Sequence, residues 1–472
     1  MTKLLILVAA ILIALPFIRG FARWELQGKI IRATVLLLVL ELVEAALYED
    51  QSLIPRGLFH PGSGSTQLRL PEVFIALALL GRLVAKKMPE RVGYPAMLWA
   101  AFGIWMAVEV AEGYLRDNNH SQITYEAKAI IYVVGGFALA SAVPARQYLD
   151  ARIFERLVRW FAPIALILDV MSAGHSAFGI RAPLLPVPAF GGVGADVATM
   201  FGAVGLIALT VELGKEQRSL WTVACTIPLF LSSVMSSQRA ALVGLAASLA
   251  LLILASMGNN ARRRLRVNVS EIVLTALAVF ALFLVVVLVP ATLNQQAPRI
   301  PFSSTINTEF SSTGKVQSAQ DRINELQAAR RMIPRELIFG WGLGLEYSYW
   351  SPGPNVEVTS ALTEDIYLDL WLRTGLVGAG LFVLAILVSL GDGLQVWRHH
   401  QDRMVSVLAL ALVAAVFGIL VKGGFESILE KYRLATMLGL LLGMLRSTVT
   451  SAGGNWSSSP ALVAEWNVIE KV

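Results

Sequence analysis

The composition of this 472-residue chain excludes most classes of soluble protein. Hydrophobic residues make up 56% of the sequence and charged residues only 15%, well below the roughly 25% that is typical of soluble domains. The formal charge of +6 does not indicate nucleic-acid binding, because the basic residues lie in short stretches between apolar segments. The single cysteine, Cys225, excludes an intrachain disulfide and a cysteine-rich metal site.

Apolar segments long enough to cross a bilayer recur along the chain. A transmembrane helix needs about 20 apolar residues, and backbone groups in lipid must be hydrogen-bonded internally, so we predict an all-α, polytopic integral membrane protein. The first span lacks a small-x-small cleavage site and is therefore interpreted as a helix and not as a signal peptide. The predicted spans are 3–19, 29–48, 70–87, 95–115, 123–144, 154–174, 196–213, 219–237, 239–257, 272–293, 365–392, 404–425 and 432–449.

The distribution of Lys and Arg predicts the orientation of these spans. Four arginines within 262–266 place the loop "NNARRRLRVNVSE" in the cytoplasm by the positive-inside rule, and alternate loops agree. The connection 294–364 is then extracytoplasmic and the tail 450–472 cytoplasmic. Thirteen crossings would put the N-terminus outside, which Lys3 opposes, and span 29–48 is the least secure. We therefore expect 12 or 13 transmembrane helices.

The spans divide the chain into four parts. A transmembrane bundle, 1–293, is followed by the long loop 294–364, by C-terminal transmembrane helices over 365–449, and by the tail 450–472. Loops as long as 294–364 are usually functional or disordered.

The long loop contains a predicted amphipathic helix in "SAQDRINELQAARRMIP", with basic residues among or opposite the apolar ones. A basic amphipathic helix beside a membrane is expected to lie in the interface. Its apolar positions at helical spacing are Ile323, Leu326, Ala329, Met332 and Ile333.

Two arginines are candidates for binding phosphate. Arg239 opens a predicted span in "SSVMSSQRAALVG" and, by the predicted orientation, lies at its outer end. Its guanidinium either anchors the helix at the membrane surface or binds phosphate, whose geometry Arg matches with two parallel hydrogen bonds. Arg322 lies on the predicted loop helix, where it is either solvated or a second phosphate ligand.

Glu364 and Asp365 form an acidic pair at the outer end of the next span. Such a pair either caps the helix or supplies a general base, because a low-dielectric surface raises a carboxyl pKa into a useful range. Topology places Arg239, Arg322 and Glu364 on one membrane face. Two guanidiniums and a carboxylate suit a phosphorylated lipid substrate and a nucleophile that must lose a proton.

Other polar patterns are less specific. Asp369 and Arg373, four residues apart, are expected to pair on their helix. The run "GWGLG" over 340–344 either forms a turn or lets backbone approach a phosphate. Glu49 and Asp50 form an acidic pair in an early outer loop, a feature of C-type membrane glycosyltransferases. The histidines have no metal-ligand spacing on one face, so no metal site is predicted.

Three stretches, in this order, resemble motifs of the O-antigen ligase and O-antigen polymerase family of bacterial membrane glycosyltransferases. "SSQRAALVGLAASL" is similar to the family's Ser-Arg motif at the start of a span, and "DRINELQAARRMIPRELIFGWGLG" to its outer-loop motif. "TEDIYLDLWLRTGLVGAGLF" is similar to "HNxYLxxLxxxGxxGxxLF", and "GVGADVATMFGAVGLIAL" fits the preceding helix more loosely. The resemblance is best over residues 196–446.

This resemblance implies glycosyl transfer at the outer face of the bacterial inner membrane. The donor would be a glycan linked to undecaprenyl pyrophosphate, without metal or cofactor, and Arg239 and Arg322 would stabilise the leaving pyrophosphate. Glu364, or else Asp365, would accept the proton of the acceptor hydroxyl. The family's ligases have a His, often followed by Asn, at these two positions, and polymerases vary more there. The departure favours a polymerase, and the expected partners are the lipid-linked glycan, membrane lipids and a chain-length regulator protein.

A lipid-linked-oligosaccharide flippase is the rival from another class. It would have a similar number of spans, internal pseudo-symmetry, short outer loops and charges deep inside its spans. The long loop 294–364 and the lack of a repeat argue against it. A C-type glycosyltransferase that uses Glu49 and Asp50 is a further alternative.

Overall fold

The computed structural model describes residues 93–141, 143, 153–178, 195–235, 239–256, 313–351, 355–361, 363–429 and 432–452. Two strands, β1 (Tyr347–Ser351) and β2 (Val356–Ser360), form an antiparallel pair. The helices are α4 (Tyr94–Leu115), α5 (His120–Ser141), α7 (Ile153–Phe178), α8 (Ala195–Gly214), α9 (Leu220–Met235), α10 (Arg239–Ser256), α14 (Thr313–Met332), the 3-10 helix η2 (Ile333–Arg335), α15 (Ile366–His399), α16 (Arg403–Gly423) and α17 (Tyr432–Ser451).

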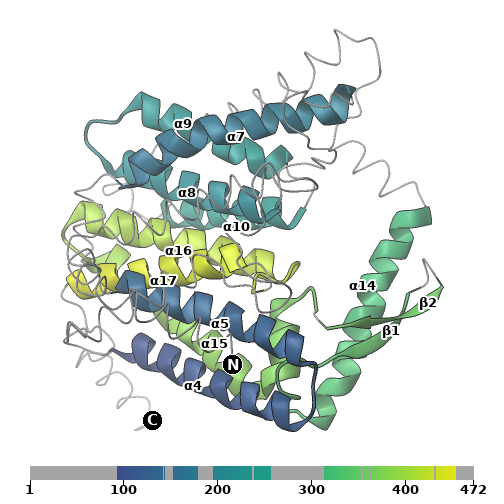
Figure 1. Ribbon diagram of the computed structural model, residues 1–472. Coiled ribbons are helices and arrows are strands. Elements are labelled where there is room, and N and C mark those ends of the chain that lie inside the picture. Colours follow the sequence, from purple (N-terminus) through teal and green to yellow (C-terminus); the bar gives the residue numbers. More distant parts are fainter. Residues whose placement is uncertain are drawn as a thin grey trace, which may run out of the picture.

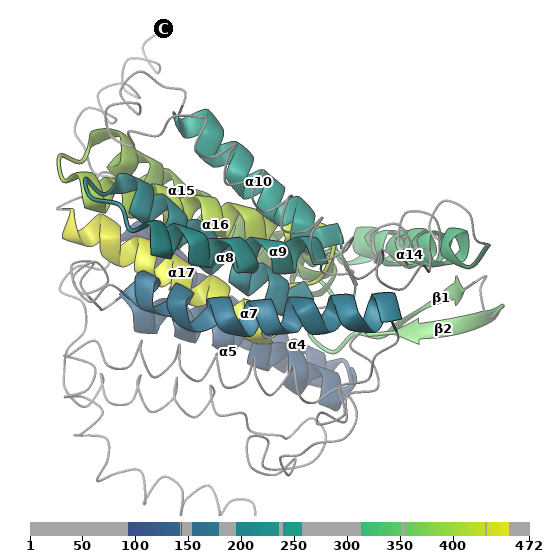
Figure 2. The same cartoon turned by 90° about the horizontal axis from the view of Figure 1, so that it is seen from above.

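The long helices lie side by side in a bundle, and α14 with the β1–β2 hairpin lies beyond one end of it (Figures 1 and 2). Within the bundle, α5 packs on α17, α10 on α16, and α15 on both α4 and α16. Among the described residues, six helices are long and apolar enough to cross a membrane: α4, α5, α8, α15, α16 and α17. The predicted all-α, multi-pass class is confirmed.

The nine predicted spans from 95–115 to 432–449 that fall on described residues are all helices. The largest difference is at α15, which runs on to His399. The four spans 3–19, 29–48, 70–87 and 272–293 lie outside the described residues, as do Glu49 and Asp50.

Local chemistry explains how several helices begin. Pro95 lies in the first turn of α4, where its missing N–H has no partner to lose. The Asp402 side chain caps α16 by accepting hydrogen bonds from the amides of Met404 at 2.9 Å and Val405 at 3.4 Å.

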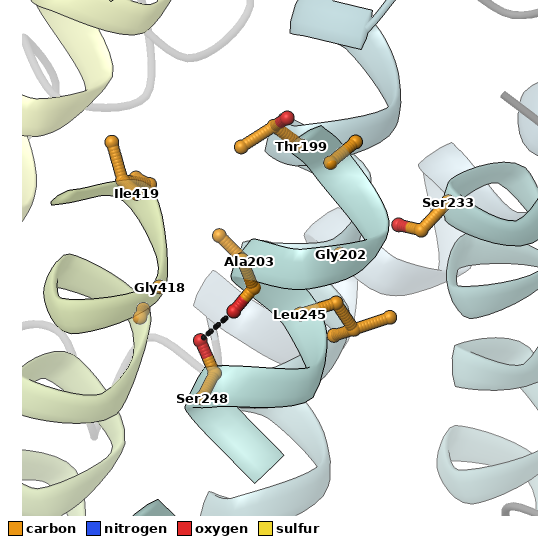
Figure 3. Close-up of a pocket in the computed structure, with 11 residues that line it drawn as sticks. Thr199, Gly202, Ala203, Ser233, Leu245, Ser248, Gly418 and Ile419 are labelled. Atoms are coloured by element: carbon orange, nitrogen blue, oxygen red, sulfur yellow. Dashed lines mark hydrogen bonds between the residues drawn. The ribbon is translucent and has the colours of Figure 1, made fainter. Parts of the chain in front are cut away.

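Small residues let α10 and α16 pack in direct backbone contact. A Cβ added at Gly418 would lie 2.5 Å from the carbonyl oxygen of Gly244, closer than any real Cβ approaches. The Ser248 hydroxyl donates to that same carbonyl at 3.0 Å, and Figure 3 shows it beside Gly418. Gly244 of α10 also lies close to Lys422 of α16, whereas Ser248 of α10 lies close to Gly418 of α16. Residue numbers along α16 therefore fall as those along α10 rise. The two helices are therefore antiparallel, and Arg239, the first residue of α10, lies at the C-terminal end of α16.

The helix α15 is broken at Gly375, whose φ of 63° is left-handed. The break removes the hydrogen bonds that the carbonyls of Leu372 and Arg373 would make within the helix. Instead, the Leu372 carbonyl accepts a hydrogen bond from the Trp341 amide at 3.0 Å, and the Arg373 carbonyl accepts one from the Gly342 amide at 2.9 Å.

The segment that contains Trp341 and Gly342 also accepts hydrogen bonds from the part of α15 that follows the break. The amides of Leu376 and Val377 donate to the carbonyls of Leu337 and Ile338 at 3.0 and 3.3 Å. The Thr374 carbonyl accepts from the Trp105 indole at 3.1 Å. Backbone groups at membrane depth must be paired within the protein, and here residues 337–342 pair those of the broken helix.

The predicted loop helix is confirmed as α14, and three of the five predicted apolar positions, Ala329, Met332 and Ile333, lie in or against one buried cluster. Ala329 and Ile333 pack with Tyr347 of β1 and Leu372 of α15, whereas Ile323 is 46% exposed. The apolar side of α14 therefore packs on protein.

We predict that Gly340 and Gly375 are required for the fold. Alanine at either position has to adopt a positive φ, which costs about 1–2 kcal/mol, and its Cβ would lie 2.3 Å from the Arg373 oxygen or 2.1 Å from the Ile338 oxygen. Gly340→Ala and Gly375→Ala should each lower the unfolding temperature of the purified protein in detergent. The control is Gly380→Ala on the same helix, where a Cβ meets nothing within 4 Å and helix propensity favours Ala by about 1 kcal/mol. Equal unfolding temperatures for all three variants would contradict this assignment.

Candidate active site

Arg322 and Glu364, 42 positions apart in the sequence, meet at the end of the bundle. Arg322 Nε lies 2.6 Å from Glu364 Oε2, and the two side chains are 59% and 44% exposed. Arg322 comes from α14 and Glu364 from the segment that leads into α15. The structure thus brings together two of the residues that the sequence predicted for one site, in a position open to a ligand.

Asp365 stabilises the start of α15. It is the N-cap of α15, and its Oδ1 accepts hydrogen bonds from the amides of Tyr367 at 2.8 Å and Leu368 at 3.2 Å. The capping interpretation is confirmed, and the two members of the acidic pair therefore differ: Asp365 holds the helix end while Glu364 contacts Arg322.

Arg239 begins α10 at the same end of the bundle. This end of α10 lies beside the C-terminal end of α16, as described above. That end of α16 is in turn held to the first turn of α15, because the Tyr367 hydroxyl donates to the Leu420 carbonyl at 2.9 Å. The helix starts that carry Arg239 and Asp365 are thus on one face, as the predicted topology required.

Two further ion pairs lie at this end of the bundle. Lys422, fully buried near the end of α16, is 2.8 Å from Glu426. Arg433 at the start of α17 is 2.7 Å from Asp196 at the start of α8. The sequence analysis did not single out these residues, since each is an ordinary flanking charge until the fold joins the helix ends.

A buried ionic cluster supports the segment that carries Glu364. Arg373, 2% exposed, lies 2.9 Å from Asp369 through Nε and 2.6 Å from Glu126 of α5 through Nη1. Its Nη2 donates to the Ala361 carbonyl, and Asp369 also accepts from the Thr363 amide at 3.2 Å. The predicted Asp369–Arg373 pair is confirmed. Removing one member of such a buried pair typically costs about 3–5 kcal/mol, so the contacts of Ala361 and Thr363 with this cluster hold both residues in place.

Glu325 is a buried carboxyl group that the sequence analysis missed. It is 7% exposed and lies one turn from Arg322 on α14. Burial raises its pKa to about 7, and the charge of Glu364 adds to the rise. The signal in the sequence was its i+3 spacing from Arg322, which puts both on one face of the helix.

The run "GWGLG" packs closely against protein backbone. Gly340, Gly342 and Gly344 all have positive φ, between 77° and 84°. A Cβ at Gly342 would lie 2.7 Å from the amide nitrogen of Gly113 in α4. The Gly344 amide donates to Glu126 at 2.8 Å. Of the two interpretations of this run, the turn is the correct one.

A cavity of about 480 Å³ lies at the opposite end of the bundle, beside the first turn of α16. It is lined by charged residues that already pair with one another, such as Lys215 with Glu212 at 2.7 Å. It is remote from Arg322 and Glu364, so cavity size does not locate the candidate site.

Comparison with known proteins agrees with the predicted resemblance. Residues 224–383 match the family model described as O-antigen ligase, and no curated protein matches the chain. The matched segment contains Arg239, Arg322 and Glu364. Over residues 224–383 the chain is thus similar to the O-antigen ligase family.

Proposed function

We propose that the protein transfers a glycan from an undecaprenyl-pyrophosphate-linked donor to a sugar hydroxyl, without a metal ion, and that it is a polymerase in preference to a ligase. The observation that carries the proposal is the contact of 2.6 Å between Arg322 and Glu364. Arg322 supplies a guanidinium that suits a leaving pyrophosphate, and Glu364 supplies a carboxylate that suits an attacking hydroxyl. The polymerase preference rests on Glu364 at the position where the family's ligases have a His.

In this proposal Arg322 and Arg239 bind the pyrophosphate. The ion pair with Glu364 engages Arg322 through Nε, which leaves the two terminal amino groups of the guanidinium to receive phosphate oxygens. Arg239 is the first residue of α10, where the N-terminal end of the helix dipole adds a positive field. Preorganised positive charge of this kind stabilises a leaving pyrophosphate as a metal ion would.

Glu364 is the proposed general base. It accepts the proton of the acceptor hydroxyl, whose oxygen attacks the anomeric carbon as the bond from that carbon to the pyrophosphate breaks. The acceptor of a polymerase is a second lipid-linked repeat. A chain-length regulator is the proposed protein partner.

The site is proposed to face the extracytoplasmic side of the inner membrane. Exposed Gln327 on α14 and exposed Gln401, between α15 and α16, report the two ends of the bundle. With Cys225 replaced by Ala, an impermeant thiol reagent should label Gln327→Cys in intact cells and Gln401→Cys only after permeabilisation. The reverse labelling would refute the orientation.

Replacing either arginine by lysine should strongly impair transfer. Lysine keeps the charge but loses the two-pronged donor geometry that matches phosphate. Arg322→Lys and Arg239→Lys are expected to lower glycan output at normal expression, whereas Arg331→Lys, on the exposed side of α14, should not. Near-normal output from both site variants would remove the pyrophosphate role.

Glu364→Gln should lower the rate of transfer by about 10²–10⁴, the usual effect of losing a general base. Asp365→Asn keeps an N-cap and should retain most activity. Transfer from lipid-linked donor in vitro separates the two. If Glu364→Gln retains more than about a tenth of the wild-type rate, Glu364 is not the base. If only Asp365→Asn loses activity, Asp365 is the base and Glu364 is not.

The flippase alternative has one observation in its favour, because charged residues do lie inside the described helices. Glu109 of α4 is fully buried, and Asp392 of α15 lies 3.9 Å from Arg446 of α17. A flippase moves a lipid-linked sugar across the membrane of proteoliposomes without lengthening the glycan. Glycan extension by the purified protein therefore distinguishes the two functions.

A further inference from the structure

An exposed apolar segment follows α14 and η2 in the chain. Its residues are Leu337, Ile338 and Phe339, which are 45%, 53% and 54% exposed. Three consecutive large apolar side chains that remain uncovered in the folded protein mark a surface that meets another apolar partner. We call these three residues the apolar segment.

The backbone of the apolar segment is fixed beside the break in α15. The Leu337 carbonyl accepts hydrogen bonds from the Leu376 amide at 3.0 Å and from the Trp371 indole at 3.3 Å. The Phe339 ring stacks on the Trp105 ring of α4, with 6.0 Å between the two ring centroids. The apolar segment is therefore held against α15 and α4, and its exposed side chains belong to an anchored part of the chain.

The part of α15 that follows the break is long enough to cross a bilayer by itself. It runs from Leu376 to His399, which at a rise of 1.5 Å per residue is about 36 Å, and the hydrocarbon core is about 30 Å thick. The part before the break contains Asp369 and Arg373, both buried within the protein. These lengths place one boundary of the membrane near the break, at the level of the apolar segment.

The apolar segment also meets the side of α15 that faces away from the bundle. Leu376, Val383, Leu384 and Leu387 are between 37% and 59% exposed and lie on one side of the helix by their spacing. Since α15 is apolar and long enough to span a membrane, this exposed side is the one that contacts lipid. Leu376 begins it and is hydrogen-bonded to Leu337, so the lipid-facing side of α15 ends at the apolar segment.

Positive charge precedes the apolar segment in the chain. Arg335 lies two residues before Leu337, and Arg330 and Arg331 lie in the last turn of α14. Both η2 and α14 contact α15. All three arginines are exposed, and none has an ion-pair partner among the described residues. Apolar side chains beside unpaired arginines match the change from hydrocarbon to anionic headgroups at a membrane surface.

We propose that residues 330–339 form a membrane anchor, in which the apolar segment enters the bilayer surface and Arg330, Arg331 and Arg335 bind the headgroups of anionic phospholipids. The apolar face of α14 itself packs on protein, so the membrane contact belongs to the end of α14 and the residues after it. The anchor holds the break in α15 at the membrane surface and thereby sets the height of α14 above it. The inference is independent of the proposed function.

Fluorescence quenching by labelled lipids tests the apolar part of the anchor. With Cys225 replaced by Ala, an NBD fluorophore is attached at Ile338→Cys, and the protein is reconstituted in vesicles whose lipids carry a nitroxide on the acyl chain near the headgroup. Quenching should be close to that at Leu384→Cys on the lipid-facing side of α15, and well above that at Glu357→Cys, exposed on β2. Quenching no greater than at Glu357→Cys would overturn the inference and would leave the apolar segment to a protein partner.

Lipid selectivity tests the basic part of the anchor and needs no label. Purified protein is mixed with equal amounts of phosphatidylglycerol and phosphatidylcholine, and the bound lipids are identified by native mass spectrometry. Wild type should bind phosphatidylglycerol in preference, and Arg335→Gln should lower this preference by about fivefold, the usual effect of one basic residue near an anionic surface. Arg335→Lys keeps the charge and should keep most of the preference. An unchanged preference after all three arginines are replaced by glutamine would overturn the inference.

Discussion

The break in α15 at Gly375 is the constraint on which the rest of the site depends. A helix at membrane depth cannot leave backbone amides and carbonyls unpaired, and Leu372, Arg373, Leu376 and Val377 all lose helical partners there. The segment 337–342 supplies them, which ties the chain that follows α14 to the interior of α15. With that segment fixed, α14 has a defined position beyond the bundle, and Arg322 reaches Glu364.

A second constraint is the fully buried charge of Arg373. A guanidinium in such a position is stable only when its partners surround it, and they come from α5, from α15 and from the Ala361 carbonyl. These contacts fix the positions of Ala361 and Thr363, next to Glu364 in the chain. Rigid support matters for the proposed chemistry, because groups that stabilise a transition state must already be in place when it forms.

The motif residues divide between structure and chemistry. The glycines of "GWGLG" allow backbone to approach α15 and α4, and Asp365 caps a helix. Arg322 and Glu364 remain partly exposed and paired, as groups that meet a ligand should be. Glu325, which is not among the predicted site residues, is buried and accepts a hydrogen bond from Tyr347. Residues that look equivalent within a motif therefore contribute through different physical effects.

The sequence alone determined what depends on neighbours along the chain. Apolar length gave the spans, four-residue spacing gave the Asp369–Arg373 pair, and an acidic residue before an apolar run gave the Asp365 cap. The hairpin was missed although "YSYWSPGPNVEVTS" has its alternation and turn residues. Only the tertiary structure decided what packs against the apolar face of α14, that Arg322 meets Glu364, and that Glu325 is buried. These features require chain segments far apart in sequence to be brought together, and burial by such segments, unlike periodicity, leaves no local pattern.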